Sequence, residues 1–193
     1  MREVDFLEVV LEPEGIKMEK AKIKVVLDWP VPKLVKDIQK FLGLAHYYWR
    51  FIEGFAKIVR LLHELTRKKQ KWDWGIRQEK SFKTLKKQFT TEPILVAPDL
   101  DKKMRMEVDA LDYMMEGVLF IECEDGKWRP VEYLSKSLNE TERNYEIYDK
   151  EILAVIRDLE NWRHLLEDAK FKFEIWTYYK NLEYFMKTQK LNQ

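Results

Sequence analysis

The chain has 193 residues, 46% of them hydrophobic and 13% aromatic, which is enough apolar material for one sizeable domain or two small ones. Only six glycines and six prolines argue against a disordered or linker-rich protein, and the single cysteine, Cys123, excludes an internal disulfide. No apolar run approaches about 18 residues, and charged residues follow Met1. We therefore expect a soluble, intracellular protein, cytoplasmic or nuclear, without a signal peptide or transmembrane segment.

The net charge of +1 hides an asymmetry between the two halves of the chain. Residues 1–98 hold 20 Lys and Arg against 13 Asp and Glu, whereas residues 99–193 hold 15 against 21. The basic half is the candidate contact for a polyanion. The acidic half is compatible with a metal-dependent site and equally with an ordinary solvated surface.

The first half of the chain predicts a strand hairpin followed by helices. Residues 4–18 alternate apolar and polar side chains around a turn at 13–15, which indicates two short strands. Two prolines in the run LDWPVP hold the next stretch extended. Helical spacing of apolar residues then predicts helices over 33–52, 55–67 and 76–89.

The second half predicts the order β-β-β-α-β-α. Strand-like runs at 104–110, 117–124 and 127–135 are separated by turn or charge clusters, and EDGK is a hairpin turn signal. A long amphipathic helix over 142–168 follows. The run FKFEIWTYY then predicts a fourth strand, and LEYFMK predicts the start of a last helix.

The helix over 142–168 organises this half. Its apolar residues recur at steps of three and four, so we expect them to share one buried face. They are Tyr145, Tyr148, Ile152, Val155, Leu159, Trp162 and Leu166. Glu151 lies on the flank of this stripe, where its carboxylate is either solvated or part of a site.

Several blocks of the chain follow the order and register of a known family. They are LDWPVP, FLGLAHYYWRFI at 41–52, WDWG, the block from PVEYLS to WRHLLE at 130–167, and TYYKNLEYF at 177–185. Together they resemble the distal half of a gypsy-type LTR retrotransposon reverse transcriptase. The resemblance implies an α+β chain: residues 1–92 form the palm-end hairpin with thumb and connection helices, and residues 93–193 form an RNase H-like domain, incomplete at its C-terminus.

The resemblance also implies a metal site. The family's RNase H domain hydrolyses the RNA strand of an RNA–DNA hybrid with two Mg²⁺ ions, which need clustered carboxylates. Asp109 matches the first-strand aspartate, in VDAL where members read TDAS, and Glu151 matches the helix glutamate. Tyr178, neutral at pH 7 and a poor Mg²⁺ ligand, stands at the third position, and the fourth is expected beyond Gln193. Two of four ligands are left, so the resemblance implies a weakened Mg²⁺ site.

The basic half offers candidate contacts for nucleic acid. Phosphates attract lysine and arginine, and tryptophans can stack on bases. The candidate residues are Lys57, Arg60, Arg67, Lys68, Lys69, Lys71, Lys83, Lys86 and Lys87, with Trp72 and Trp74. The alternative is a solvated helix surface over core tryptophans. Binding through phosphates would be independent of base sequence.

Three functions stay open on the sequence. The first is a retrotransposon-derived reverse transcriptase and RNase H fragment without catalytic activity that binds RNA–DNA hybrid or duplex. The second is an active Mg²⁺-dependent ribonuclease H within a longer Pol polyprotein, and the third is an interaction scaffold. The chain contains no Asp-Asp pair, so it lacks the aspartates with which reverse transcriptases of this family bind the nucleotide. We therefore expect no DNA synthesis by this chain alone. We expect the polymerase palm and fingers upstream of Met1 and the remainder of RNase H downstream of Gln193.

Overall fold

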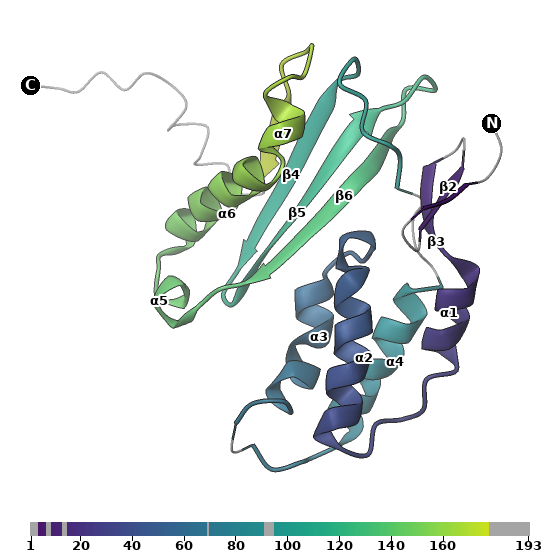
Figure 1. Cartoon of the computed structure of the whole chain (residues 1–193). Helices are drawn as coiled ribbons and strands as arrows, with labels where there is room; N and C mark the ends of the chain where they lie inside the picture. The colour runs from purple at the N-terminus through teal and green to yellow at the C-terminus, as the bar shows by residue number, and fades with distance from the viewer. Residues whose placement is uncertain (1–3, 7–8, 13–14, 69, 91–94, 178–193) are drawn as a thin grey trace, which may run out of the picture. The chain divides into compact units, whose positions relative to one another are not determined.

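The computed structural model describes residues 4–6, 9–12, 15–68, 70–90 and 95–177 (Figure 1). The chain forms two compact units. Unit 1 comprises residues 1–97 and 130–135, and unit 2 comprises residues 98–129 and 136–193. None of the described helices is long and apolar enough to cross a membrane.

Unit 1 begins with a three-stranded antiparallel sheet in the order β1-β2-β3. The strands are β1 (Val4–Phe6), β2 (Val9–Glu12) and β3 (Gly15–Met18). The prediction of two strands was wrong, because the first run is itself a hairpin in which Phe6 pairs with Val9. No Gly or Pro separates these two residues, so the sequence carried no turn signal there.

The helices of unit 1 differ from the prediction in two places. They are α1 (Lys20–Leu27), α2 (Val35–Tyr47), the 3₁₀ turn η1 (Trp49–Phe51), α3 (Phe55–Glu64) and α4 (Ile76–Gln88). Helix α1 was not predicted, because its local helix propensity is weak. It buries Val26 completely, so tertiary packing stabilises this short helix. The predicted helix over 33–52 ends at Tyr47, and Gly54 adopts φ 64, a left-handed conformation that glycine adopts without strain.

The core of unit 1 is aromatic. Phe41 of α2 and Phe82 of α4 lie with ring centroids 4.6 Å apart, and Tyr48 meets Phe89 edge-on at 6.0 Å. All four side chains are almost fully buried. Tilted and edge-on ring pairs of this kind stabilise a core beyond the area they bury. The buried residues of α2 and α4 recur at helical spacing, as predicted, but Leu34 at the start of the first predicted helix is 63% exposed.

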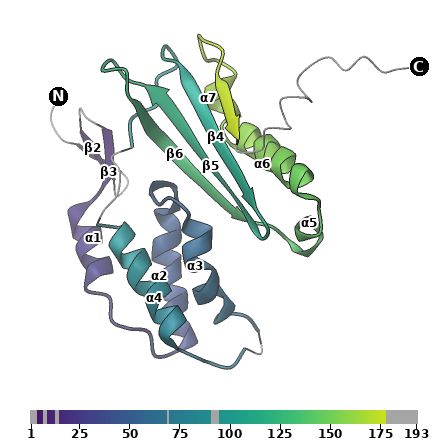
Figure 2. The same ribbon diagram turned by 180° about the vertical axis from the view of Figure 1, so that it is seen from behind.

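Unit 2 is built on a four-stranded mixed sheet in the order β6-β5-β4-β7 (Figure 2). The strands are β4 (Met104–Leu111), β5 (Met114–Glu122), β6 (Trp128–Ser137) and β7 (Glu174–Thr177). Strand β4 pairs antiparallel with β5 and parallel with β7. The EDGK hairpin is confirmed: the Cys123 N–H donates to the Lys127 carbonyl, and Gly126 adopts φ 71.

The long helix predicted over 142–168 is three helices: α5 (Glu140–Arg143), α6 (Ile147–Asn161) and α7 (Arg163–Leu166). Helix α6 packs on β4 and β5 (Figures 1 and 2). Its buried residues are Lys150, Glu151, Ala154 and Asp158. The predicted buried face was therefore wrong over most of its length. Tyr145 and Tyr148 are 42% and 41% exposed, and only Trp162 and Leu166 of the stripe are buried.

Candidate functional site

Asp109 and Glu151, predicted as metal ligands, lie on neighbouring elements of unit 2. Asp109 is a half-buried residue near the end of β4, and Glu151, which is 3% exposed, projects from α6. Glu151 accepts a hydrogen bond from the backbone of Ala110, the residue that follows Asp109. Burial raises the pKa of the Glu151 carboxyl, and the charge of Asp109 adds to that rise. The structure therefore places the two carboxylates that the sequence singled out on adjoining elements.

Both oxygens of Glu151 accept hydrogen bonds from the protein. Oε1 accepts from the Ala110 N–H at 3.4 Å, and Oε2 accepts from the Thr177 hydroxyl at 2.9 Å. Burial raises the pKa of Glu151, and these two hydrogen bonds oppose that rise. Thr177, which the sequence did not single out, ends β7 and orients the carboxylate. Tyr178 lies outside the described residues.

Glu116 lies directly opposite Asp109 in the β4–β5 ladder. Residues opposite each other on antiparallel strands project from the same face of the sheet, with Cβ atoms about 5 Å apart. The resemblance leads us to expect glycine at this position. The pairing of β4 with β5 therefore places the bulk and charge of Glu116 next to Asp109.

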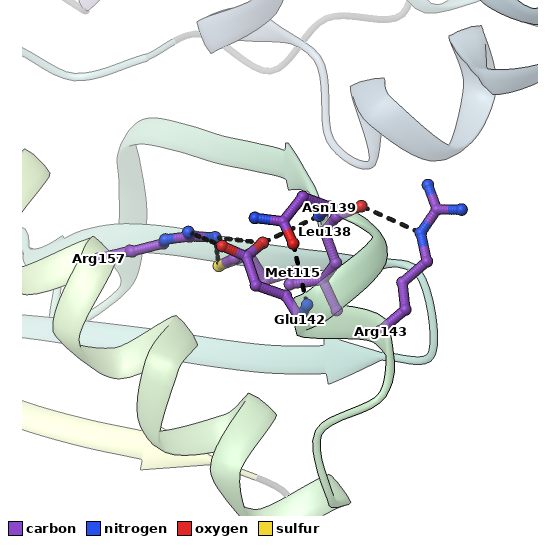
Figure 3. A network of polar contacts seen from close by, with 6 residues as sticks. All are labelled: Met115, Leu138, Asn139, Glu142, Arg143 and Arg157. Carbon is purple, nitrogen blue, oxygen red and sulfur yellow. Dashed lines mark hydrogen bonds and ion pairs between the residues drawn. The ribbon is translucent and has the colours of Figure 1, made fainter.

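A network of polar contacts holds α5 and α6 to β5 (Figure 3). The Glu142 N–H donates to Asn139 Oδ1 and the Asn139 N–H donates to Glu142 Oε2, both at 2.9 Å, so Asn139 and Glu142 form a capping box at the start of α5. Arg157 of α6 pairs with Glu142 and contacts the sulfur of Met115. Its guanidinium lowers the pKa of Glu142. This network fixes the helix that carries Glu151.

In unit 1, Trp72 and Trp74 form a stacked pair beside α4. Their ring centroids are 5.7 Å apart with an interplanar angle of 12°, and Trp74 meets Phe82 edge-on at 5.8 Å. Both tryptophans are half-buried. Trp74 therefore anchors the pair to the core, and Trp72 is the outer ring.

The lysines of α4 divide into two groups. Lys86 is committed to the fold: its ammonium donates to the Trp29 carbonyl at 2.8 Å and lies 5.2 Å from the centroid of the Phe82 ring. Burial lowers its pKa. Lys83 and Lys87 are exposed along a shallow depression of about 360 Å³. Ile76, Glu79, Lys80 and Thr84 complete its lining.

Lys80 was not among the predicted contact residues, although its spacing of three from Lys83 could have indicated the shared face. We call Lys80, Lys83 and Lys87 the α4 lysine ridge. Among the other predicted contacts, Lys57, Arg67, Lys68 and Lys71 are exposed, and Arg60 pairs with Glu64 at 3.2 Å. Lys69 lies outside the described residues.

Residues 74–173, just over half of the chain, match the model of the RNase H-like domain found in reverse transcriptase. The chain belongs to this family. The Tf2-3 and Tf2-4 transposon polyproteins of Schizosaccharomyces pombe are 33% identical to it over 180 residues, or 93% of this chain. The resemblance to a gypsy-type retrotransposon reverse transcriptase is confirmed. The chain spans about 14% of the length of these relatives.

Solved structures of foamy viral protease–reverse transcriptase share the fold of this RNase H-like chain. The one in complex with dsDNA aligns with TM-score 0.79 at 17% identity, covering 98% of this chain and 39% of that one. The one in complex with RNA/DNA hybrid aligns with TM-score 0.77 at 18% identity, covering 96% and 25%. The predicted α+β class is confirmed.

RNase H-like domains of reverse transcriptases are generally Mg²⁺-dependent, so the fit of this site to the ion is a physical question. Mg²⁺ binds carboxylate oxygens, usually from one or two residues together with water and phosphate. Asp109 and Glu151 are the right donors, but both oxygens of Glu151 already accept protein hydrogen bonds. In the described part of the chain, no three His, Cys, Asp or Glu side chains gather to hold a metal. These residues do not fit a two-metal clamp.

Proposed function

We propose that this segment of a retrotransposon reverse transcriptase and RNase H polyprotein binds duplex nucleic acid, RNA–DNA hybrid or DNA, without cleaving it. The α4 lysine ridge beside the stacked tryptophans is the observation that carries the proposal. Its three lysines are exposed over two helical turns, and one of them, Lys83, also pairs with Glu79 at 2.6 Å. Contacts of this kind recognise phosphates and not bases.

The solved structures that share this fold support a double-stranded nucleic acid as the partner. The two foamy viral structures hold dsDNA and RNA/DNA hybrid. From these two structures we infer for this chain only the class of ligand, which is a double-stranded polyanion. The basic first half and acidic second half direct such a ligand to unit 1.

The absence of cleavage follows, in this proposal, from the state of the carboxylate site. A two-metal mechanism needs several carboxylates that are ionised and turned to the metal ions. Glu151 is buried, hydrogen-bonded through both oxygens and has a raised pKa. Tyr178 stands where the resemblance leads us to expect an aspartate.

Replacing the α4 lysine ridge should weaken hybrid binding. We expect Lys80→Gln, Lys83→Gln and Lys87→Gln together to reduce affinity equally for unrelated sequences, and to lower the slope of log K against log salt by about one for each lysine that touches a phosphate. Fluorescence anisotropy with labelled hybrid and DNA duplex at several salt concentrations measures both effects. The matched control is Lys127→Gln, Lys136→Gln and Lys172→Gln together, three exposed lysines of unit 2. Equal affinity of the ridge variant and the unaltered protein would contradict the proposal.

Mg²⁺ should not elicit cleavage by the unaltered chain. We expect labelled RNA in an RNA–DNA hybrid to stay intact after incubation with protein and Mg²⁺, because the described carboxylates do not form a two-metal site. The Asp109→Asn variant and the Tyr178→Asp variant are assayed beside it on denaturing gels. Cleavage by the unaltered chain that disappears in Asp109→Asn would establish the nuclease function instead.

A further inference from the structure

Helix α6 buries a second carboxyl that the candidate site does not use. Asp158 is 1% exposed, and neither of its side-chain oxygens has a hydrogen-bond partner among the described residues. It lies two turns after Glu151 on the same helix face, with the fully buried Ala154 between them. Buried carboxyl groups without partners are rare because their desolvation is costly.

The sheet provides space for this carboxyl at a single glycine. A Cβ atom added to Gly117 of β5 would overlap Oδ2 of Asp158 and lie 2.6 Å from its Cγ. The carboxyl therefore lies against the backbone of β5, where no side chain separates helix from strand. The Trp162 indole N–H, one turn further along the helix, is also buried without a partner in the described part of the chain.

The charged groups around Asp158 are engaged elsewhere. On α6, Arg157 pairs with Glu142 of α5, the buried Lys150 pairs with Asp112 at 3.9 Å, and Glu151 bonds to Ala110 and Thr177. On β5, Glu116 precedes Gly117 and is itself acidic; on β4, Asp109 lies opposite Glu116. Arg163 and His164 of α7 are exposed, and Arg163 pairs with Glu167. Burial alone raises the pKa of Asp158 to about 8.

We propose that Asp158 is a proton-binding lock between α6 and β5: the protonated carboxyl holds the helix against Gly117, and loss of the proton releases it. The neutral carboxyl is tolerated in this contact, whereas the carboxylate finds no cation or donor among the described residues to compensate its burial. Because Glu151 lies on the same helix, release also withdraws it from Ala110 and Thr177.

The direction of the pH dependence follows from linkage. The folded state retains the proton of Asp158 up to a pKa of about 8, and an opened or unfolded state loses it near the ordinary aspartate value of 3.8. Between these limits the folded state binds more protons, so rising pH favours opening. The opening equilibrium constant grows up to about tenfold per pH unit in this window and levels off above it.

The lock is tested in the full chain by hydrogen exchange of α6 amides and by urea unfolding, each from about pH 5 to about pH 9, a range that covers the upper part of the window from 3.8 to about 8 and the levelling-off above it. We expect α6 to lose protection as pH rises, after correction for the intrinsic exchange rate, and Asp158→Asn to remove that part of the pH dependence. The asparagine keeps the shape and does not titrate. Arg163→Gln, which changes an exposed charge near the end of the helix, should leave the dependence unchanged.

A direct titration keeps the test decisive if Asp158→Asn fails to fold. Carbon-13 NMR of the side-chain carboxyl groups of the unaltered protein should show one aspartate that titrates well above the ordinary range and is assigned to Asp158. An Asp158 carboxyl that titrates in the ordinary aspartate range, or the same pH dependence in Asp158→Asn and the parent, would overturn the proposal.

Discussion

Gly117→Ala should destabilise unit 2 by about 3 kcal/mol, because the added methyl group would overlap the Asp158 carboxyl, whose Cγ lies 2.6 Å from the ideal Cβ position. Neither partner can retreat easily. Asp158 has a short side chain on a packed helix, and Gly117 lies within β5, paired with Val108 of β4. Urea unfolding followed by circular dichroism measures the decrease in stability.

The steric origin of this effect is tested by a second substitution. Asp158→Ala removes the overlapping atoms, so Gly117→Ala should cost far less in that background, and the double-mutant cycle should give a coupling energy of about 2 kcal/mol or more. The control is Gly43→Ala in α2, where a Cβ meets nothing within 4 Å. That change should stabilise by up to about 1 kcal/mol, since alanine is the better helix former. Additive effects of the first two substitutions would refute the overlap.

Arg157→Ala should cost about 3 kcal/mol, because it leaves the Glu142 carboxylate largely buried without its cation. The side chains of this pair are only 20% and 11% exposed. The Arg163–Glu167 pair, 72% and 58% exposed, is the matched comparison in the same segment. Arg163→Ala should cost below about 1 kcal/mol, as solvent screens such pairs.

The pH dependence of stability gives the Arg157 prediction a second readout. Arg157 lowers the pKa of Glu142 in the folded state, so the pair stabilises above the ordinary glutamate range, and its contribution disappears as pH falls through the lowered pKa. The parent should become unstable in acid more steeply than Arg157→Ala. Identical acid profiles, or an equal cost for the buried and exposed pairs, would contradict the role assigned to the network.

Local signals in the sequence identified most elements of unit 2 and part of its site. The hairpin turn at EDGK and the strand run at 104–110 depend on neighbouring residues only, and both are confirmed. Asp109 and Glu151 were paired by resemblance, and they lie on the adjoining elements β4 and α6. Thr177 was missed because it belongs to no sequence pattern, whereas the helical spacing of Lys80 from Lys83 was a usable signal.

The apolar pattern of helix α6 predicted the wrong buried face. Its apolar residues form a regular stripe, and hydrophobic periodicity normally marks the buried face. The structure instead turns Glu151, Ala154 and Asp158 to the sheet. Gly117 of β5 leaves room for the Asp158 carboxyl, and Ala154 is fully buried, so packing against the sheet and not the apolar pattern of the helix selects the buried face.

Residue identity and short-range spacing were enough to establish the family, the α+β class, the candidate carboxylate pair and the charge asymmetry. The three-dimensional packing was needed to show which face of α6 is buried, that Lys86 belongs to the fold, and that Glu116 lies opposite Asp109. It also decided that Asp158 lies against Gly117, which is far from it in the chain. Strand register and helix rotation set these contacts, and both arise from packing between segments that are distant in sequence.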